Sequence, residues 1–171
     1  MAKRISLREF QESLTDRLLL AEQGQVSRAL LGVESGHNFW LLDLADSGEV
    51  VPLTTLTSVP LTKSWFAGVA NIRGTLYSVV DFAAFMGLEP TPRNSEARLL
   101  LAGARHGINS ALLVTRTLGL RPLDNLEPDP AARRDERPWI GDTYLDPQGR
   151  RWSRLQVRPL LADRQFIEIG L

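Results

Sequence analysis

After Gly24 the chain is a succession of short apolar segments separated by turn-forming residues, and this pattern limits the fold more than any other property. The segment 29–34 alternates with the period of a β-strand. Turn residues at 35–38 (Ser-Gly-His-Asn) then precede a second apolar run at Phe39–Leu42. The spacing therefore predicts a β-hairpin rather than a helix at the start of the main domain.

Three more strands and a tight turn follow. Glu49–Val51 begins a strand in which Pro52 indicates an edge position or a bulge, because proline cannot donate to a ladder. Val69–Ile72 and Leu76–Phe82 flank Arg73-Gly74, where glycine suits a backbone angle that penalises side chains. The sequence thus predicts a second hairpin with its tip at Arg73-Gly74.

The second half of the chain repeats this order of elements, although residue identity between the halves is slight. Several short strands with turns at regular intervals are typical of small barrels. The prediction is a mainly β fold, with two similar β modules side by side and short helical turns. The segments concerned are Leu99–Ala102 and Ile108–Val114, which echo the first hairpin, Trp139–Leu145 and Arg151–Gln156, which echo the second, and the helical turns Ala83–Met86 and Val157–Leu161.

The N-terminal part is different. Ser6 and Glu9 have the spacing of a capping box, in which each side chain satisfies a free amide at a helix start. Apolar residues then recur at helical spacing, so we predict an amphipathic helix over Leu7–Ala21. The chain divides into a helical extension, 1–24, and a main domain, 25–171. The helix either covers one end of a sheet or docks a partner.

Composition excludes several classes of protein. The 171 residues carry 20 Lys plus Arg and 20 Asp plus Glu, and this balance argues against a nucleic-acid partner. Without cysteine there is no disulfide or thiolate metal site. Neither a signal peptide nor an apolar stretch of the ~20 residues needed to span a bilayer is present. We expect a cytoplasmic protein that does not insert into a membrane.

Residues for catalysis are scarce. His37 and His106 are the only histidines, and both are predicted at hairpin tips beside a glycine, where a mobile loop would hold a general base poorly. No phosphate-binding or zinc-binding spacing is present, so no cofactor or metal is expected. A hydrolase with an unrecognised carboxylate pair stays open as an alternative. The carboxylates at strand ends or turns are Asp43, Asp81, Asp142 and Asp146.

Two other features have simple structural interpretations. The four tryptophans are spread over the chain, which favours packing anchors over a base-stacking platform. The segment Glu127–Pro138 has three prolines and seven charges, which is typical of a solvated loop. Its arginines could also hold an acidic partner. The residues concerned are Trp40, Trp65, Trp139 and Trp152, and Arg133, Arg134 and Arg137.

One block of residues points to a family. Val59-Pro60 is followed by Trp65–Gly74 (WFAGVANIRG) and then by Val79–Phe82 (VVDF). As a block these residues resemble the central motif of CheW-like domains, a proline-led turn, an aromatic residue, then G-V-x-N-L-R-G and V-V-D-L. Ile72 and Phe82 stand in the places of leucines.

The resemblance extends over Ser27–Leu171, with two departures. Where the family often has an acidic residue after a valine of its second barrel, this chain has Thr115, so no role of that carboxylate carries over. The N-terminal helix and the loop Glu127–Pro138 are additions that resemble the PilI-type subgroup, which controls type IV pili and twitching motility.

The resemblance implies two five-stranded β-barrels and no catalysis. It implies an adaptor that couples the cytoplasmic tip of a chemoreceptor to the regulatory domain of a CheA-like histidine kinase. The candidate partner-binding residues are Arg73, Asn71, Glu49, Val50 and Gly74.

Arg73 has two alternative roles. Its planar guanidinium offers five donors that could bind carboxylates or carbonyls of a partner. It could instead form an internal ion pair, with Asp81 as the candidate acid. For Gly68 and Gly74, backbone geometry is favoured over partner contact.

Overall fold

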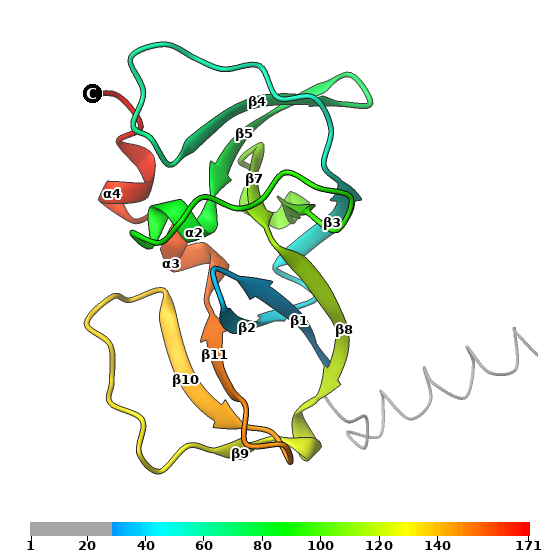
Figure 1. Ribbon diagram of the computed structural model, residues 1–171, viewed down its shortest axis with the longest axis vertical. Coiled ribbons are helices and arrows are strands. Elements are labelled where there is room, and N and C mark those ends of the chain that lie inside the picture. Colours follow the sequence, from blue (N-terminus) through cyan, green and yellow to red (C-terminus); the bar gives the residue numbers. More distant parts are fainter. Residues whose placement is uncertain (1–28) are drawn as a thin grey trace, which may run out of the picture.

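A computed structural model describes residues 29–171 (Figure 1). The predicted capped helix over Leu7–Ala21, and with it the extension 1–24, lies outside the described residues. The remainder is built of two β-sheets with short helices beside them, which confirms the prediction of a mainly β fold with helical turns.

The first sheet has six strands in the order β8-β1-β2-β11-β10-β9. All of its pairs are antiparallel except β2 with β11, which run parallel. The strands are β1 (Ala29–Ser35), β2 (Asn38–Asp43), β8 (Arg116–Pro122), β9 (Glu127–Pro128), β10 (Ile140–Leu145) and β11 (Arg151–Leu155).

The second sheet has five strands in the order β3-β6-β7-β5-β4. Here β5 and β7 are the parallel pair. The strands are β3 (Ser47–Pro52), β4 (Phe66–Ile72), β5 (Thr75–Asp81), β6 (Arg98–Ala102) and β7 (Ser110–Val114).

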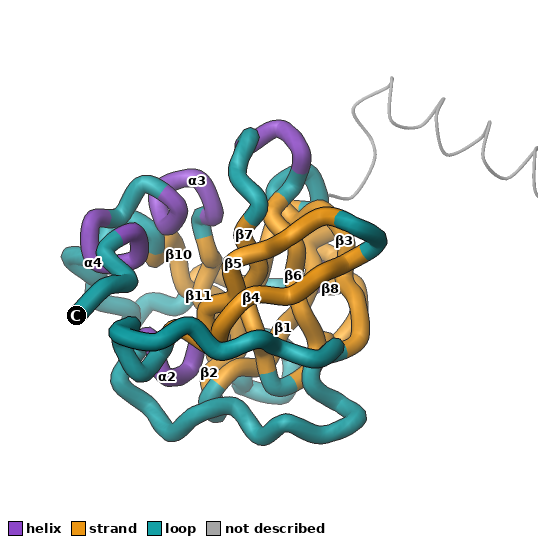
Figure 2. Tube along the Cα trace, turned by 90° about the horizontal axis from the view of Figure 1, so that it is seen from above, coloured by secondary structure: helices purple, strands orange, loops and turns teal. Residues whose placement is uncertain are grey.

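Three short α-helices lie together on one side of the molecule (Figures 1 and 2). They are α2 (Phe82–Phe85), α3 (Val157–Leu161) and α4 (Arg164–Ile167), and two 3-10 turns lie at Ala104–His106 and Leu123–Asn125. Across residues 29–171 we find no helix with the length and apolar character needed to cross a membrane.

The predicted repeat of elements is present, but its two halves interlock. Strands β8, β1, β2, β11 and β10 occupy the same places in the first sheet as β3, β6, β7, β5 and β4 in the second. Each sheet therefore takes strands from both halves of the chain, and the chain crosses between sheets after β2 and again after β7 (Figure 1).

The strands bury three hydrophobic clusters. We name them the central cluster, which draws on both sheets and all three helices, the five-strand cluster and the six-strand cluster. Alternate residues of one strand enter different clusters, as Leu112 and Leu113 of β7 do. All five strands of the second sheet, its two outer ones included, contribute to the five-strand cluster, so that sheet curls around its own core.

The tryptophans act as packing anchors, as predicted. Trp40, Trp139 and Trp152 are buried, and Trp65 packs on the central cluster. Trp40 packs edge-on against Phe82 at 5.1 Å between ring centroids. The loop Glu127–Pro138 is largely exposed, as predicted, apart from Asp129, which is buried.

The barrel prediction holds only in part. Two five-stranded barrels were expected, whereas the sheets have six and five strands, and within residues 29–171 the outer strands of neither sheet pair with each other. Strand β8 was not predicted. It mixes Arg116, Gly119 and Arg121 with apolar residues, and its register on β1 is shifted by an irregularity, so it lacks the clean alternation of a strand.

Gly68 sits where β4 is approached by a neighbouring segment. Its φ is 126°, and a Cβ built there would lie 2.3 Å from the carbonyl oxygen of Thr57. That approach follows from paired hydrogen bonds between Thr57 and Val69, both 2.9 Å. Only glycine fits, which confirms that Gly68 is set by backbone geometry.

We therefore expect Gly68→Ala to lower the free energy of unfolding by about 2–4 kcal/mol, from backbone strain and the backbone clash together. Urea denaturation of the purified chain measures this loss. Gly149→Ala is the control, because φ is 79° there but nothing lies within 4 Å of the added Cβ. That variant should lose about 1–2 kcal/mol. Equal losses would contradict the close approach at Gly68.

Candidate partner-binding surface

The β4–β5 turn presents Arg73 to solvent. Arg73 and Gly74 both have positive φ, 52° and 85°, which matches the two-residue loop of a type I′ hairpin. The side-chain Oδ1 of Asn71 accepts a hydrogen bond of 2.9 Å from the Gly74 amide. Asn71 and Gly74, predicted as contact residues, therefore build the turn on which Arg73 is displayed.

Strand β3 supplies the other side of this surface. It is an edge strand that pairs with β6 alone among the described residues, so the edge position inferred from Pro52 is confirmed. Its register shifts between Ser47 and Val50, and this irregularity includes Glu49. Glu49 is exposed, whereas Val50 is half-buried and packs on the central cluster.

Arg73 and Glu49 form a two-pronged ion pair. Arg73 Nη1 donates to Glu49 Oε1 at 2.9 Å, and Nη2 donates to Oε2. The pair joins the β4–β5 turn to β3, and β4 and β3 are the two outer strands of the five-stranded sheet. The side chains stay 68% and 48% exposed, so the pair lies on the rim of the curled sheet in contact with solvent. We call Arg73, Glu49 and the residues that position them the rim site.

The ion pair changes the titration of both groups. The hydrogen bonds from Arg73 hold the pKa of Glu49 below its ordinary 4.5. The hydrogen bonds to Glu49 raise the pKa of Arg73 further above its ordinary value. Both groups are therefore charged at neutral pH. Because both are exposed, solvent screens the pair, and its contribution to folding is small.

Arg73 does form the internal ion pair given as one of its two alternative roles, but its partner is Glu49 and not Asp81. Asp81, the acid suggested as its partner, is 6% exposed and bound elsewhere. It accepts hydrogen bonds from the Thr91 amide at 2.8 Å, the Thr91 hydroxyl at 2.7 Å and the Ala84 amide at 3.3 Å. Asp81 thus caps α2 and ties down the connector after it. Glu49 was nominated separately, and no local sequence signal linked it to Arg73, since the two lie 24 positions apart.

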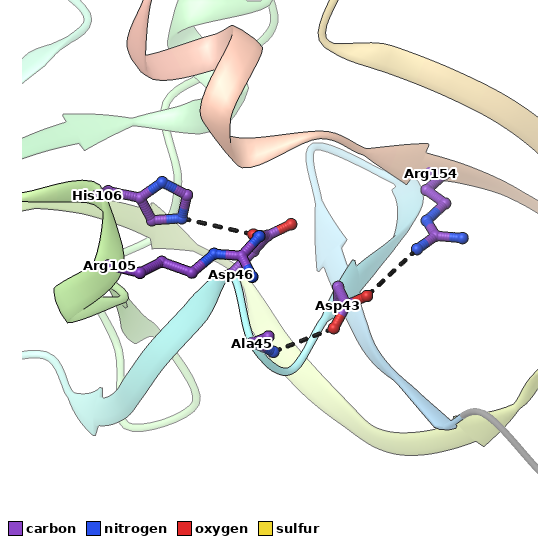
Figure 3. A network of polar contacts seen from close by, with 6 residues as sticks. All are labelled: Asp43, Ala45, Asp46, Arg105, His106 and Arg154. Atoms are coloured by element: carbon purple, nitrogen blue, oxygen red, sulfur yellow. Dashed lines mark hydrogen bonds and ion pairs between the residues drawn. The ribbon is translucent and has the colours of Figure 1, made fainter. Parts of the chain in front are cut away.

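The histidines differ from each other. His37 is exposed with φ of 66°, as expected of a turn residue. His106 lies between β6 and β7 beside Gly107, as predicted, but its side chain is only 4% exposed and therefore does not project from the surface. Its Nε2 lies 3.5 Å from Oδ1 of Asp46, which also pairs with Arg105 (Figure 3). The contact joins the β2–β3 and β6–β7 connections.

Three of the four candidate carboxylates, Asp81, Asp43 and Asp146, have structural partners in the chain, whereas Asp142 is exposed. Asp43 at the end of β2 accepts from the Ala45 amide at 3.1 Å and lies 3.5 Å from Arg154 of β11 (Figure 3). Asp146 accepts from the Trp152 indole at 3.0 Å and from amides of its own turn. No three His, Asp or Glu side chains of the described part gather as metal ligands.

Comparison with known proteins places the chain in a family. The sequence model of the CheW-like domain matches residues 29–165. The chain is 29% identical to protein PilI of Pseudomonas aeruginosa over 144 residues, which cover 82% of this chain and 79% of that protein. It is 24% identical over 89 residues to a probable chemotaxis protein CheW of Rhizobium etli, covering 52% of this chain and 57% of that protein.

A solved structure agrees with the fold. The crystal structure of the scaffolding protein TtCheW from Thermoanaerobacter tengcongensis aligns with a TM-score of 0.67 at 17% sequence identity, covering 84% of this chain and 98% of that chain. The resemblance expected over 27–171 is thus confirmed over most of its length, and so is the likeness to PilI. The family is one of non-enzymatic adaptors of chemotaxis-type signalling, which removes the hydrolase alternative. The chain belongs to the CheW-like domain family.

Proposed function

We propose that this protein is a cytoplasmic adaptor that couples the tip of a chemoreceptor to the regulatory domain of a CheA-like histidine kinase. The observation that carries the proposal is the exposed Arg73–Glu49 pair, whose arginine belongs to the block that resembles the central motif of CheW-like domains. The similarity to PilI supports type IV pilus motility as the output.

The rim site has the properties of a surface that can exchange partners. Arg73 has five guanidinium donors, and two of them are engaged by Glu49. The remaining donors are available to carbonyls or carboxylates of a second protein. Because the internal pair is solvent-exposed, exchanging it for an intermolecular pair costs little.

Strand β3 adds an apolar part to this surface. Its outer edge is unpaired among the described residues, and exposed Glu49 is followed by half-buried Val50. Packing beside Val50 would bury apolar area, and Glu49 would set the orientation of a partner by charge. The five nominated residues thus have different roles, with Arg73, Glu49 and Val50 as contacts and Asn71 and Gly74 as supports of the turn.

A charge exchange separates partner contact from internal pairing. We expect Arg73→Glu to weaken binding of kinase regulatory domain or receptor fragments by about tenfold or more, because it sets two acids side by side and removes a donor. The thermal unfolding midpoint should stay close to that of the parent protein. Binding measured by calorimetry, with coupled kinase activity as a second readout, checks both statements.

The double variant Arg73→Glu/Glu49→Arg restores the internal pair with reversed charges. If Arg73 itself contacts a partner, binding stays weak in the double variant. Full recovery would show that only the internal pair matters. Arg164→Glu is the matched control, since Arg164 forms a comparably exposed pair with Glu168 at the end of α4, outside the rim site. A control that loses binding as strongly as Arg73→Glu would overturn the proposal.

The internal pair itself can be tested through Glu49. We expect Arg73→Gln to raise the pKa of Glu49 back toward its ordinary 4.5, because the hydrogen bonds that lower it are lost. A carboxylate with a depressed folded pKa stabilises the fold above its unfolded pKa, and this contribution is lost as pH falls through the folded pKa. Carboxyl NMR titration measures the change. An unchanged Glu49 titration would mean that the pair does not persist in solution.

A further inference from the structure

A second candidate binding surface lies on the six-stranded sheet, where the loop 129–139 extends widely beside β10 (Figure 1). A cavity of about 540 Å³ lies between this loop, the β1–β2 turn and the β10–β11 hairpin. Its lining combines apolar side chains, among them Phe39, Trp40 and Met86, with several arginines. We call it the arginine groove. Its lining includes no residue of the rim site.

The acids around the groove are already engaged. Asp135 is its one acidic lining residue, and it forms a two-pronged pair with Arg137 at 2.8 and 2.7 Å. That pair holds the pKa of Asp135 down at about 2, so the carboxylate stays ionised and bound. Arg151 lies 2.7 Å from Asp129, whose side chain is 2% exposed.

Two other arginines line the groove without an ion-pair partner among the described residues. Within the part of the chain that the structure describes, Arg133 makes no hydrogen bond or ion pair, and Arg150 makes no ion pair through its guanidinium. The Asp146 carboxylate interacts electrostatically with Arg150, but the two side chains form no ion pair within 4 Å. The groove therefore keeps two unneutralised positive charges, from two separate elements.

Arg150 is also held in place. Its guanidinium carbon lies 4.3 Å from the centroid of the Phe39 ring and 6.0 Å from that of Trp152. A guanidinium stacked on aromatic rings keeps its N–H groups directed outward in its own plane, where they can bind a carboxylate. Less side-chain entropy is lost on binding, because the stacking already limits the rotamers.

We propose that the arginine groove binds an acidic segment of a partner protein, with Arg133 and Arg150 as the groups that bind its carboxylates. Its volume, about 540 Å³, exceeds the needs of one carboxylate and suits a short peptide with apolar contacts along Phe39 and Met86. Trp40, 3% exposed, lines the same groove, and its indole N–H has no acceptor among the described residues.

The inference deepens the adaptor function by adding a second binding surface, and it rests on that function only for the identity of the partner. The groove can be tested without kinase or receptor. We suggest titrating the full chain with an acetylated hexaglutamate amide at physiological ionic strength, followed by tryptophan fluorescence and calorimetry. Hexalysine, glutarate and inorganic phosphate are the comparison ligands.

We expect saturable binding of hexaglutamate, with the Kd raised about tenfold in Arg133→Glu and in Arg150→Gln, since each removes a charge-assisted contact. Arg133→Glu lies on an exposed loop without internal partners, so it tests the groove without loss of folding. Arg134→Glu is the matched control, because Arg134 is its neighbour and lines only the adjacent cavity between the loop and β10, whereas Arg133 lines both cavities. Its Kd should stay within about twofold of the parent value.

Three results would overturn the proposal. The first is the absence of saturable hexaglutamate binding, and the second is an equal loss in Arg134→Glu, which would mean attraction by general charge. The third is binding of glutarate or phosphate as tight as that of the peptide, which would make the groove a small-anion site. None of these results bears on Arg73, and failure of the charge exchange at the rim site would not change the peptide titration.

Discussion

Packing of apolar side chains between the two sheets holds this fold together, and the ring contacts of Trp40, Phe82 and Trp139 show how. Trp40 comes from one sheet, Phe82 begins the helix after the other, and Trp139 precedes β10, yet their ring centroids lie 5.1 to 6.2 Å apart. The cluster includes residues of both sheets and all three helices, so neither sheet can bury its inner face alone. Because strands of both halves are exchanged between sheets, the described domain should unfold as one unit.

The rim site follows from this packing. One face of the five-stranded sheet contributes side chains to the central cluster. The opposite face contributes side chains to the five-strand cluster, around which the sheet curls. Curling brings the outer strand β3 toward the β4–β5 turn, and there the backbone of the turn displays Arg73 opposite Glu49. The buried clusters supply the stability, while the exposed pair contributes little to it. A surface of this kind can change its ionic contacts without loosening the fold, as an adaptor requires.

Local sequence patterns predicted the features that depend on local backbone geometry. The hairpin tip at Arg73-Gly74, the glycine at 68 and the strands around them were all expected from turn chemistry and period-two alternation. What they could not predict is which strands become neighbours. Strand β8 pairs with β1 across a long stretch of chain, with Arg116 binding Glu34 82 positions away. The burial of His106 and the choice of Glu49 over Asp81 for Arg73 depend on the same long-range arrangement, which no local period encodes.

The structural equivalence of the two sheets gives a reason to look for two binding surfaces. Strands β3 and β4, which flank the rim site, correspond in position to β8 and β10 of the other sheet. In the six-stranded sheet, however, β9 and the loop that follows it cover the outer side of β10. The added loop replaces an open edge with a groove that carries unneutralised arginines. A partner at one sheet and a second at the other would meet different chemistry on the same rigid core, so one chain could hold both without competition between them.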